Sequence, residues 1–262
     1  MATDDKIATG GEASYDNDSR RRFLSRNLLA AGVVLAGSMA SKSASATSWS
    51  AGCCFLRGTK IRTLDGDRNI EDLVPGDVLP TLFGGTRRIQ WVARHSYRKS
   101  DAEKPWVEDV RPIRILRSAI APGVPSRDVY LSKEHRLYVD GVLVRACNLV
   151  NGTTILVDTA EQWDELEYFN LKLECHDVVY AEDLTCESLL EVCETAANFA
   201  DYYRTYGEPK GEETPCAPVA RYGGRRDLIL SRLRSAASPW LDRRTKIDVV
   251  RDRLEERALT LV

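Results

Sequence analysis

A series of short alternating segments constrains the fold of this chain more than any other feature. Between Thr59 and Leu184, apolar and polar residues alternate in short runs, and turn-forming residues separate the runs. The clearest turn is Asp140-Gly141, a dipeptide typical of a two-residue hairpin. These segments predict an all-β domain. The predicted strands are residues 60–64, 70–73, 88–93, 112–116, 129–131, 135–139, 142–145, 153–157, 168–173 and 178–181.

The pattern changes beyond Leu184, where apolar residues recur at helical spacing. Two of the helices expected here are amphipathic, with arginines on the outer face. We therefore expect an all-β domain over residues 54–188 and a helical tail over residues 189–262 that packs on it. The predicted helices are residues 189–203, 228–233 and 249–254.

Residues 1–46 differ from the rest of the chain. Ser19-Arg20-Arg21-Arg22-Phe23-Leu24 fits the twin-arginine export pattern, and residues 28–37 form an apolar run too short to span a bilayer. Ala44-Ser45-Ala46 is typical of a leader peptidase site. We expect a twin-arginine signal peptide over residues 1–46, leaving a short upstream segment over residues 47–53. The expectation is a bacterial protein that is exported to the periplasm or secreted, with no stable membrane span after signal removal.

Two alternatives for this region stay open. The leader would act as an uncut membrane anchor if leader peptidase did not cleave it. Ser50-Ala51-Gly52-Cys53 resembles a truncated lipoprotein signal, which would place a lipid on Cys53. That signal lacks its usual leucine, and a polar stretch separates it from the apolar run.

Composition narrows the classes of function. With 43% hydrophobic and 29% charged residues, the chain has enough apolar mass for a core. The net charge of −2, without a basic stripe, argues against nucleic acid as a partner. The seven cysteines include no C-x-x-C pair, so we predict neither a zinc site nor another cofactor. Their disulfide pairing stays open.

Three groups of residues carry side chains suited to acyl transfer. Cys54 precedes Phe55-Leu56-Arg57-Gly58-Thr59 at the start of the β region. Ser132 lies three residues before His135, and His176 lies between two late strands. A cysteine nucleophile, a hydroxyl and a histidine are the residue types that such chemistry needs. The alternative is a buried or disulfide-bonded cysteine with structural histidines. The third histidine, His95, lies among basic residues and is expected to be solvated.

At these positions the sequence resembles the Hint domain, the self-processing module of Hedgehog proteins and inteins. Cys54 through Thr59 resembles the family's opening block, and residues 70–77 resemble its recurrent I-E-x-L-x-x-G-D stretch. Ser132-x-x-His135 resembles its Thr-x-x-His block, with Ser in place of Thr. Residues 168–181 resemble the late block, whose histidine is here His176. The resemblance, which extends into the tail, is closest to bacterial Hint-type proteins with a helical tail.

The resemblance implies a self-processing mechanism rather than a turnover enzyme. The Cys54 sulfur would attack the carbonyl carbon of Cys53, so that the upstream peptide becomes a thioester in an N-to-S acyl shift. His135 would loosen the amide and protonate the leaving nitrogen, and Ser132 would hydrogen-bond the scissile peptide or the developing oxyanion. His176 would assist attack by water or a small nucleophile on the thioester. The substrate in cis is the chain's own upstream peptide.

The sequence departs from splicing inteins at one place. Inteins end in His-Asn before a Cys, Ser or Thr, whereas the corresponding stretch here is Ala181-Glu182-Asp183-Leu184-Thr185-Cys186. Without the asparagine, we expect N-terminal cleavage and no splicing. Two further hypotheses stay open: an inactive Hint fold used as an exported binding or structural domain, and a Cys-His hydrolase acting on external substrates.

Overall fold

The computed structural model describes residues 53–99, 101, 103–192, 194–208, 213–220, 224–239 and 241–261. All of these residues belong to one compact unit, Ser48–Val262. The predicted signal peptide and Cys193 lie outside the described residues.

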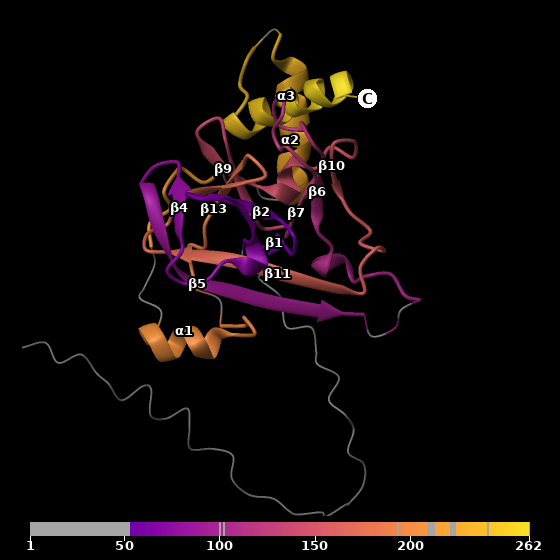
Figure 1. Cartoon of the computed structure of the whole chain (residues 1–262). Helices are drawn as coiled ribbons and strands as arrows, with labels where there is room; N and C mark the ends of the chain where they lie inside the picture. The colour runs from indigo at the N-terminus through magenta and orange to yellow at the C-terminus, as the bar shows by residue number, and fades with distance from the viewer. Residues whose placement is uncertain are drawn as a thin grey trace, which may run out of the picture. The chain divides into compact units, whose positions relative to one another are not determined.

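Thirteen strands form two antiparallel sheets in the described part of the chain (Figure 1). The seven-stranded sheet has the order β10-β6-β7-β1-β11-β5-β4, and the six-stranded sheet has the order β3-β2-β12-β13-β8-β9. The strands are β1 (Phe55–Leu56), β2 (Lys60–Thr63), β3 (Gly66–Asn69), β4 (Val78–Thr81), β5 (Gly85–Arg98), β6 (Ile113–Ile115), β7 (Val129–Leu131), β8 (Arg136–Val139), β9 (Val142–Arg145), β10 (Ile155–Val157), β11 (Glu165–Leu173), β12 (Val178–Ala181) and β13 (Leu184–Glu187).

The predicted all-β fold is confirmed, and each predicted strand except residues 70–73 overlaps an observed one. Residues 70–72 form a 3-10 helix instead of a strand. The hairpin at Asp140-Gly141 forms as expected, with Val139 paired to Val142 and positive φ angles of 50° and 84° at the two turn residues. Such angles suit a tight turn between right-twisted strands, and glycine adopts them without steric cost.

Four observed strands were not predicted, each for a local reason: β1, β3, β4 and β13. Strand β1 has two residues, β3 is made of polar residues, and β4 contains Pro80, which is unusual within a sheet. Strand β13 follows Glu182-Asp183, where the turn has φ angles of 48° and 68° without a glycine. The absence of a glycine removed the usual turn signal.

Strands β5 and β11 run side by side along most of their length, as Figure 1 shows. Apolar side chains from both sheets form one main core, which includes Phe55, Leu131 and Phe169. The described chain also has three 3-10 helices, η1 (Ile70–Asp72), η2 (Glu108–Val110) and η3 (Ala146–Leu149), and three α-helices, α1 (Phe199–Tyr206), α2 (Gly224–Ala237) and α3 (Lys246–Leu261).

The prediction of a helix over residues 189–203 was wrong at its start. Helix α1 begins at Phe199, whereas the backbone N–H of Leu189 donates to the Leu171 carbonyl at 2.8 Å. The Leu189 side chain packs with Trp91 in a separate apolar cluster. Ser188 and Leu189 therefore continue along the sheet, and tertiary contacts override the helical spacing of this segment.

The tail packs on the β domain, as the sequence predicted. Ile247, Val250 and Leu254 of α3 belong to the main core. Arg251 is buried and donates to Ser231 of α2 at 3.3 Å, so the expectation that these arginines face outward fails at this position. No helix among the described residues is long and apolar enough to cross a membrane.

Candidate functional site

Strand register places Cys54 opposite Ser132. Phe55 pairs with Leu131, and the strands are antiparallel, so the residue before Phe55 faces the residue after Leu131. The Cys54 N–H donates to Ser132 Oγ at 2.9 Å, and the Ser132 N–H donates to the Cys54 carbonyl at 2.9 Å. Both residues are buried. The Ser132 hydroxyl therefore contacts the nitrogen of the Cys53–Cys54 peptide bond.

His135 lies close to Ser132 because it ends the turn that begins at Ser132. Its N–H donates to the Ser132 carbonyl at 3.1 Å, and its ring meets the Phe55 ring edge-on at 4.3 Å between centroids. The side chain is fully buried. The Cys54 backbone lies beside the ring and favours its protonated form.

Burial controls the protonation of His135. Removal from water lowers its pKa to about 4, against smaller opposing effects of Glu187 and the Cys54 backbone. The imidazole is therefore neutral at pH 7. A neutral imidazole accepts a proton, and its buried conjugate acid then gives the proton up readily.

The Cys54 side chain packs in an aromatic cluster on one side of the sheet. Leu56, Trp106 and Tyr168 are buried in this cluster with Cys54, and Trp163 packs against it. The Tyr168 hydroxyl donates to the Val110 carbonyl at 2.7 Å, and burial raises the pKa of this phenol. These groups form an apolar surrounding for the Cys54 side chain.

Glu187 lies at the meeting point of three strands. In β13, Cys186 pairs with Leu137 of β8, and Glu187 pairs with Val178 of β12. The carboxylate therefore lies between Arg136 and His176. The Arg136 N–H donates to Oε1 at 3.2 Å, and Arg136 Nη1 donates to Oε1 at 3.1 Å and to Oε2 at 3.0 Å. The Cys53 thiol also donates to Oε1.

Glu187 is ionised although it has no exposed surface. Burial alone would raise its pKa, but His176, Arg136 and the Cys53 thiol outweigh that effect and hold the pKa below its usual range. A buried carboxylate needs such partners because an unpaired charge in the interior is costly. The charged groups beside Cys53 are therefore the buried Glu187 carboxylate and the half-buried Arg136 guanidinium that pairs with it.

The tail fixes the orientation and tautomer of His176. The Cys216 N–H donates to His176 Nδ1 at 2.9 Å, so Nδ1 is an acceptor and the proton lies on Nε2. Nε2 lies 3.5 Å from Glu187 Oε2. Residues near Cys216 are held to the domain, because the Leu143 N–H donates to the Pro218 carbonyl at 2.8 Å.

Asp177, next to His176, has a structural environment. Its buried carboxylate accepts hydrogen bonds from Thr81 Oγ1 at 3.1 Å and from the Phe83 N–H at 3.0 Å. Arg87 Nε lies 3.3 Å away. Asp177 therefore joins the β4–β5 turn to the start of β12.

The structure brings together the predicted residues in two linked groups. Ser132 and His135 lie beside the Cys54 backbone, and His176 faces Glu187, which binds the Cys53 thiol. The expectation that His95 is solvated was wrong. His95 is buried opposite Tyr168, because the alternation of β5 turns it inward, and burial lowers its pKa.

Glu187 is a residue of the site to which the sequence assigned no chemical role. It ends β13, the strand that lacked a glycine turn signal. The alternation of Leu184-Thr185-Cys186-Glu187 after two acidic turn residues would have indicated a strand. Its side chain still acquires its partners only through pairing with β8 and β12.

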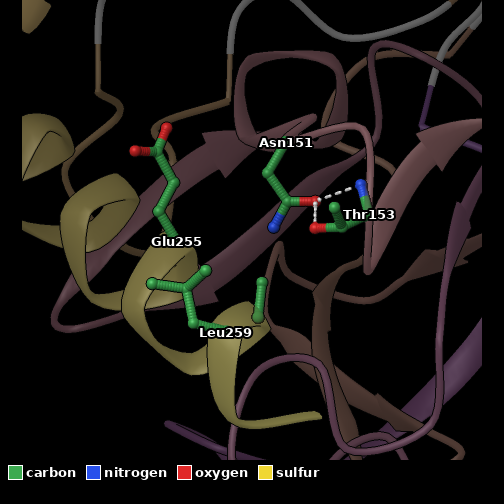
Figure 2. A pocket seen from close by; sticks show the side chains of 5 residues that line it. Asn151, Thr153, Glu255 and Leu259 are labelled. Atoms are coloured by element: carbon green, nitrogen blue, oxygen red, sulfur yellow. Dashed lines mark hydrogen bonds between the residues drawn. The ribbon is translucent and has the colours of Figure 1, made fainter. Parts of the chain in front are cut away.

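A cavity of about 370 Å³ lies apart from these residues, between the loop at Asn151 and helix α3 (Figure 2). Asn151, Thr153, Glu255, Ala258 and Leu259 line it, and none of the predicted site residues does. Asn151 Oδ1 accepts hydrogen bonds from the Thr153 N–H and hydroxyl, both at 3.1 Å. The Asn151 side chain therefore stabilises its own turn.

Comparison with known proteins identifies the family. Residues 53–192 match the family model described as the Hint domain. No curated protein sequence matches the chain. Solved structures that it resembles weakly include the gp41-1 intein, with 14% identity and a TM-score of 0.37 over 52% of this chain and 98% of that one. The bacterial intein-like domain from Clostridium thermocellum has 15% identity and a TM-score of 0.36 over 52% of this chain and 97% of that one.

The sequence match to the family model is the basis of the assignment. It begins at Cys53, includes Cys54, Ser132, His135, His176 and Glu187, and covers more than half of the chain. This chain therefore belongs to the Hint domain family, with a Hint-fold β domain followed by a helical tail.

Proposed function

We propose that this chain cleaves itself between Cys53 and Cys54 through an N-to-S acyl shift, without splicing. The observation that carries the proposal is the contact of Ser132 Oγ with the Cys54 nitrogen at 2.9 Å, next to the buried and neutral His135. Family membership supports self-processing in general, and this geometry supports the chemistry at the Cys53–Cys54 bond.

The proposed step moves one proton and exchanges one bond. The Cys54 thiol gives up its proton, which passes to His135 beside the Cys54 backbone, and the sulfur attacks the Cys53 carbonyl carbon. The carbon–nitrogen bond then breaks, and His135 gives the proton to the Cys54 nitrogen. The products are a thioester at Cys54 and a free amine on the same residue. The low pKa of His135 suits the second transfer, because its buried cationic form is a strong acid.

Ser132 holds the leaving nitrogen rather than the carbonyl oxygen. Its two hydrogen bonds with the Cys54 backbone fix the scissile peptide beside His135. Such positioning raises the rate of a reaction within one chain because the reacting groups are already held close together in the required orientation. In the second step water or a small nucleophile attacks the thioester, and we propose that His176 assists it.

Two features support cleavage without splicing. The stretch that corresponds to the end of an intein has no asparagine. In the structure, Ala181 ends β12, and Leu184 and Cys186 lie in β13, which is paired with β8 on one side and β12 on the other.

We also propose that the protein is exported by the twin-arginine route. The N-terminal residue of the exported protein distinguishes cutting after Ala46 from cutting before Cys54.

The test uses the full chain made in a cell-free system without export machinery. Intact mass is followed with and without hydroxylamine, which traps a thioester as a hydroxamate. We expect fragments 1–53 and 54–262, and an intact chain in the Cys54→Ala variant. His135→Ala removes the proton carrier, so cleavage should slow by about 10²- to 10⁴-fold.

Two results would contradict the proposal. A parent chain that stays whole under hydroxylamine and matches Cys54→Ala would favour an inactive Hint fold that serves as an exported binding or structural domain. Cleavage of added peptides by a chain that lacks residues 1–53 would instead favour a hydrolase that acts in trans.

A further inference from the structure

Glu187 meets the side chain of the residue on the acyl side of the proposed scissile bond. That residue, Cys53, is 7% exposed, and Glu187 has no exposed surface. The Cys53 thiol donates to Glu187 Oε1, and the Glu134 carbonyl lies 4.0 Å from the same sulfur. The side chain of residue 53 thus occupies a small enclosed pocket with an anionic wall.

The pocket is held rigidly by β8. Arg136 binds both Glu187 oxygens through Nη1 and binds Oε1 through its own backbone N–H. His176 Nε2, which carries a proton, faces Oε2. Oε1 therefore remains directed at Cys53, while Oε2 is engaged by Arg136 and faces His176.

The electrostatics of the pocket favour a neutral donor. Burial and the adjacent Glu187 raise the pKa of the Cys53 thiol, so the side chain keeps its proton. A carboxylate acceptor stabilises a group that donates a hydrogen bond and repels a group that carries a negative charge. A branched or long side chain would have to displace Arg136 or the backbone of Glu134.

We propose that Glu187 is a specificity-determining residue, which selects a small hydrogen-bond donor, a thiol or a hydroxyl, immediately before the scissile bond. The inference rests on the proposed function, because the pocket matters for cleavage only if the Cys53–Cys54 bond is the one that reacts. Glu187 acts by positioning the acyl group, since its contact is with the side chain and not with the reacting atoms.

The first experiment varies residue 53 in the full chain and measures the cleavage rate by intact mass. Cys53→Ser keeps a donor and should react within a few-fold of the parent. Cys53→Ala leaves Oε1 with one partner fewer and should slow cleavage about tenfold or more. Cys53→Asp places two carboxylates together and should slow it at least about a hundredfold. Cys147→Ser, a half-buried thiol outside the pocket, is the matched control.

The second experiment repeats the series with Glu187→Gln. The amide keeps the shape of the side chain but removes its charge and adds a donor. The preference at residue 53 should then reverse, so that Cys53→Asp reacts faster than Cys53→Ser. A purely structural role of Glu187 would lower all rates together and leave their order unchanged, and that result would overturn the inference.

A third measurement keeps the inference testable if the chain does not cleave itself. The melting temperature is measured for Cys53→Asp and Glu187→Gln, singly and together, in the Cys54→Ala chain. We expect Cys53→Asp to lower the melting temperature of the chain that has Glu187. In the Glu187→Gln background, adding Cys53→Asp should leave the melting temperature nearly unchanged. Additive effects would overturn the inference. If the effects are coupled and the parent chain does not cleave itself, the pocket is retained and only the proposed function is rejected.

Discussion

At the scale of single residues, two adjacent cysteines enter different surroundings. The Cys53 thiol donates to Glu187, whereas Cys54 packs among Leu56, Trp106 and Tyr168. Successive side chains of an extended chain point to opposite faces, which explains the separation. In the reaction that we propose, Glu187 recognises Cys53 and Cys54 is the nucleophile.

His135 should make the fold sensitive to acid. Its pKa is about 4 in the folded chain and near 6.5 in the unfolded chain, so the unfolded state binds the proton first as the pH falls. Stability due to the neutral ring is complete above about pH 6.5 and is lost as the pH falls toward 4. Between pH 7 and pH 5 the loss should be about 2 kcal/mol.

The measurement is urea unfolding of the Cys54→Ala chain at pH 7 and at pH 5. His135→Gln cannot titrate in this range, so it should lose about 2 kcal/mol less on acidification than its parent. His95→Gln measures the share of the other histidine whose pKa burial lowers. An equal acid effect with and without His135 would show that folding leaves the pKa of its ring unchanged.

At the scale of elements, a segment outside the Hint family match and a strand inside it complete the site. The match ends at residue 192, but the Cys216 N–H binds His176 Nδ1. Strand β13 supplies Glu187 because it pairs with β8 on one side and β12 on the other. The site is thus assembled from sequence positions that are far apart.

Replacing Cys216 tests the segment that holds His176. Cys216→Pro removes the N–H donor, which frees His176 to adopt the other tautomer, and should slow thioester hydrolysis about tenfold. Cys216→Ala keeps the donor and is the matched control. The lifetime of the hydroxylamine-sensitive species, and its pH profile, report the effect. Identical lifetimes in the two variants would exclude a role for this hydrogen bond.

At the scale of the whole molecule, the helical tail is part of the core rather than an appendage. Leu254 of α3 is 1% exposed and packs in the main cluster with residues of both sheets. Arg253 pairs with Asp140 at 2.6 Å, and Arg234 of α2 pairs with Asp248 of α3. Removal of the tail would expose the core that it covers.

A pair of leucines on α3 measures this contribution. Leu254→Ala should lower the free energy of unfolding by about 2 to 5 kcal/mol, because it leaves a cavity in the main core. Leu259→Ala on the same helix should change it by less than about 0.5 kcal/mol, because Leu259 is 83% exposed. Urea unfolding of both variants measures the two changes in the free energy of unfolding. A change for Leu254→Ala as small as that for Leu259→Ala would show that the packing of α3 does not stabilise the domain.

The sequence by itself determined the all-β class, the helical tail and the spacing of Cys54, Ser132 and His135. Alternation, turn residues and short motifs are local, so they can be read along the chain. Only the tertiary structure decided that Glu187 faces Cys53, that Cys216 sets the tautomer of His176, and that His135 and His95 are buried. The physical reason is that partners and burial arise from strand pairing between distant segments, which no local pattern encodes.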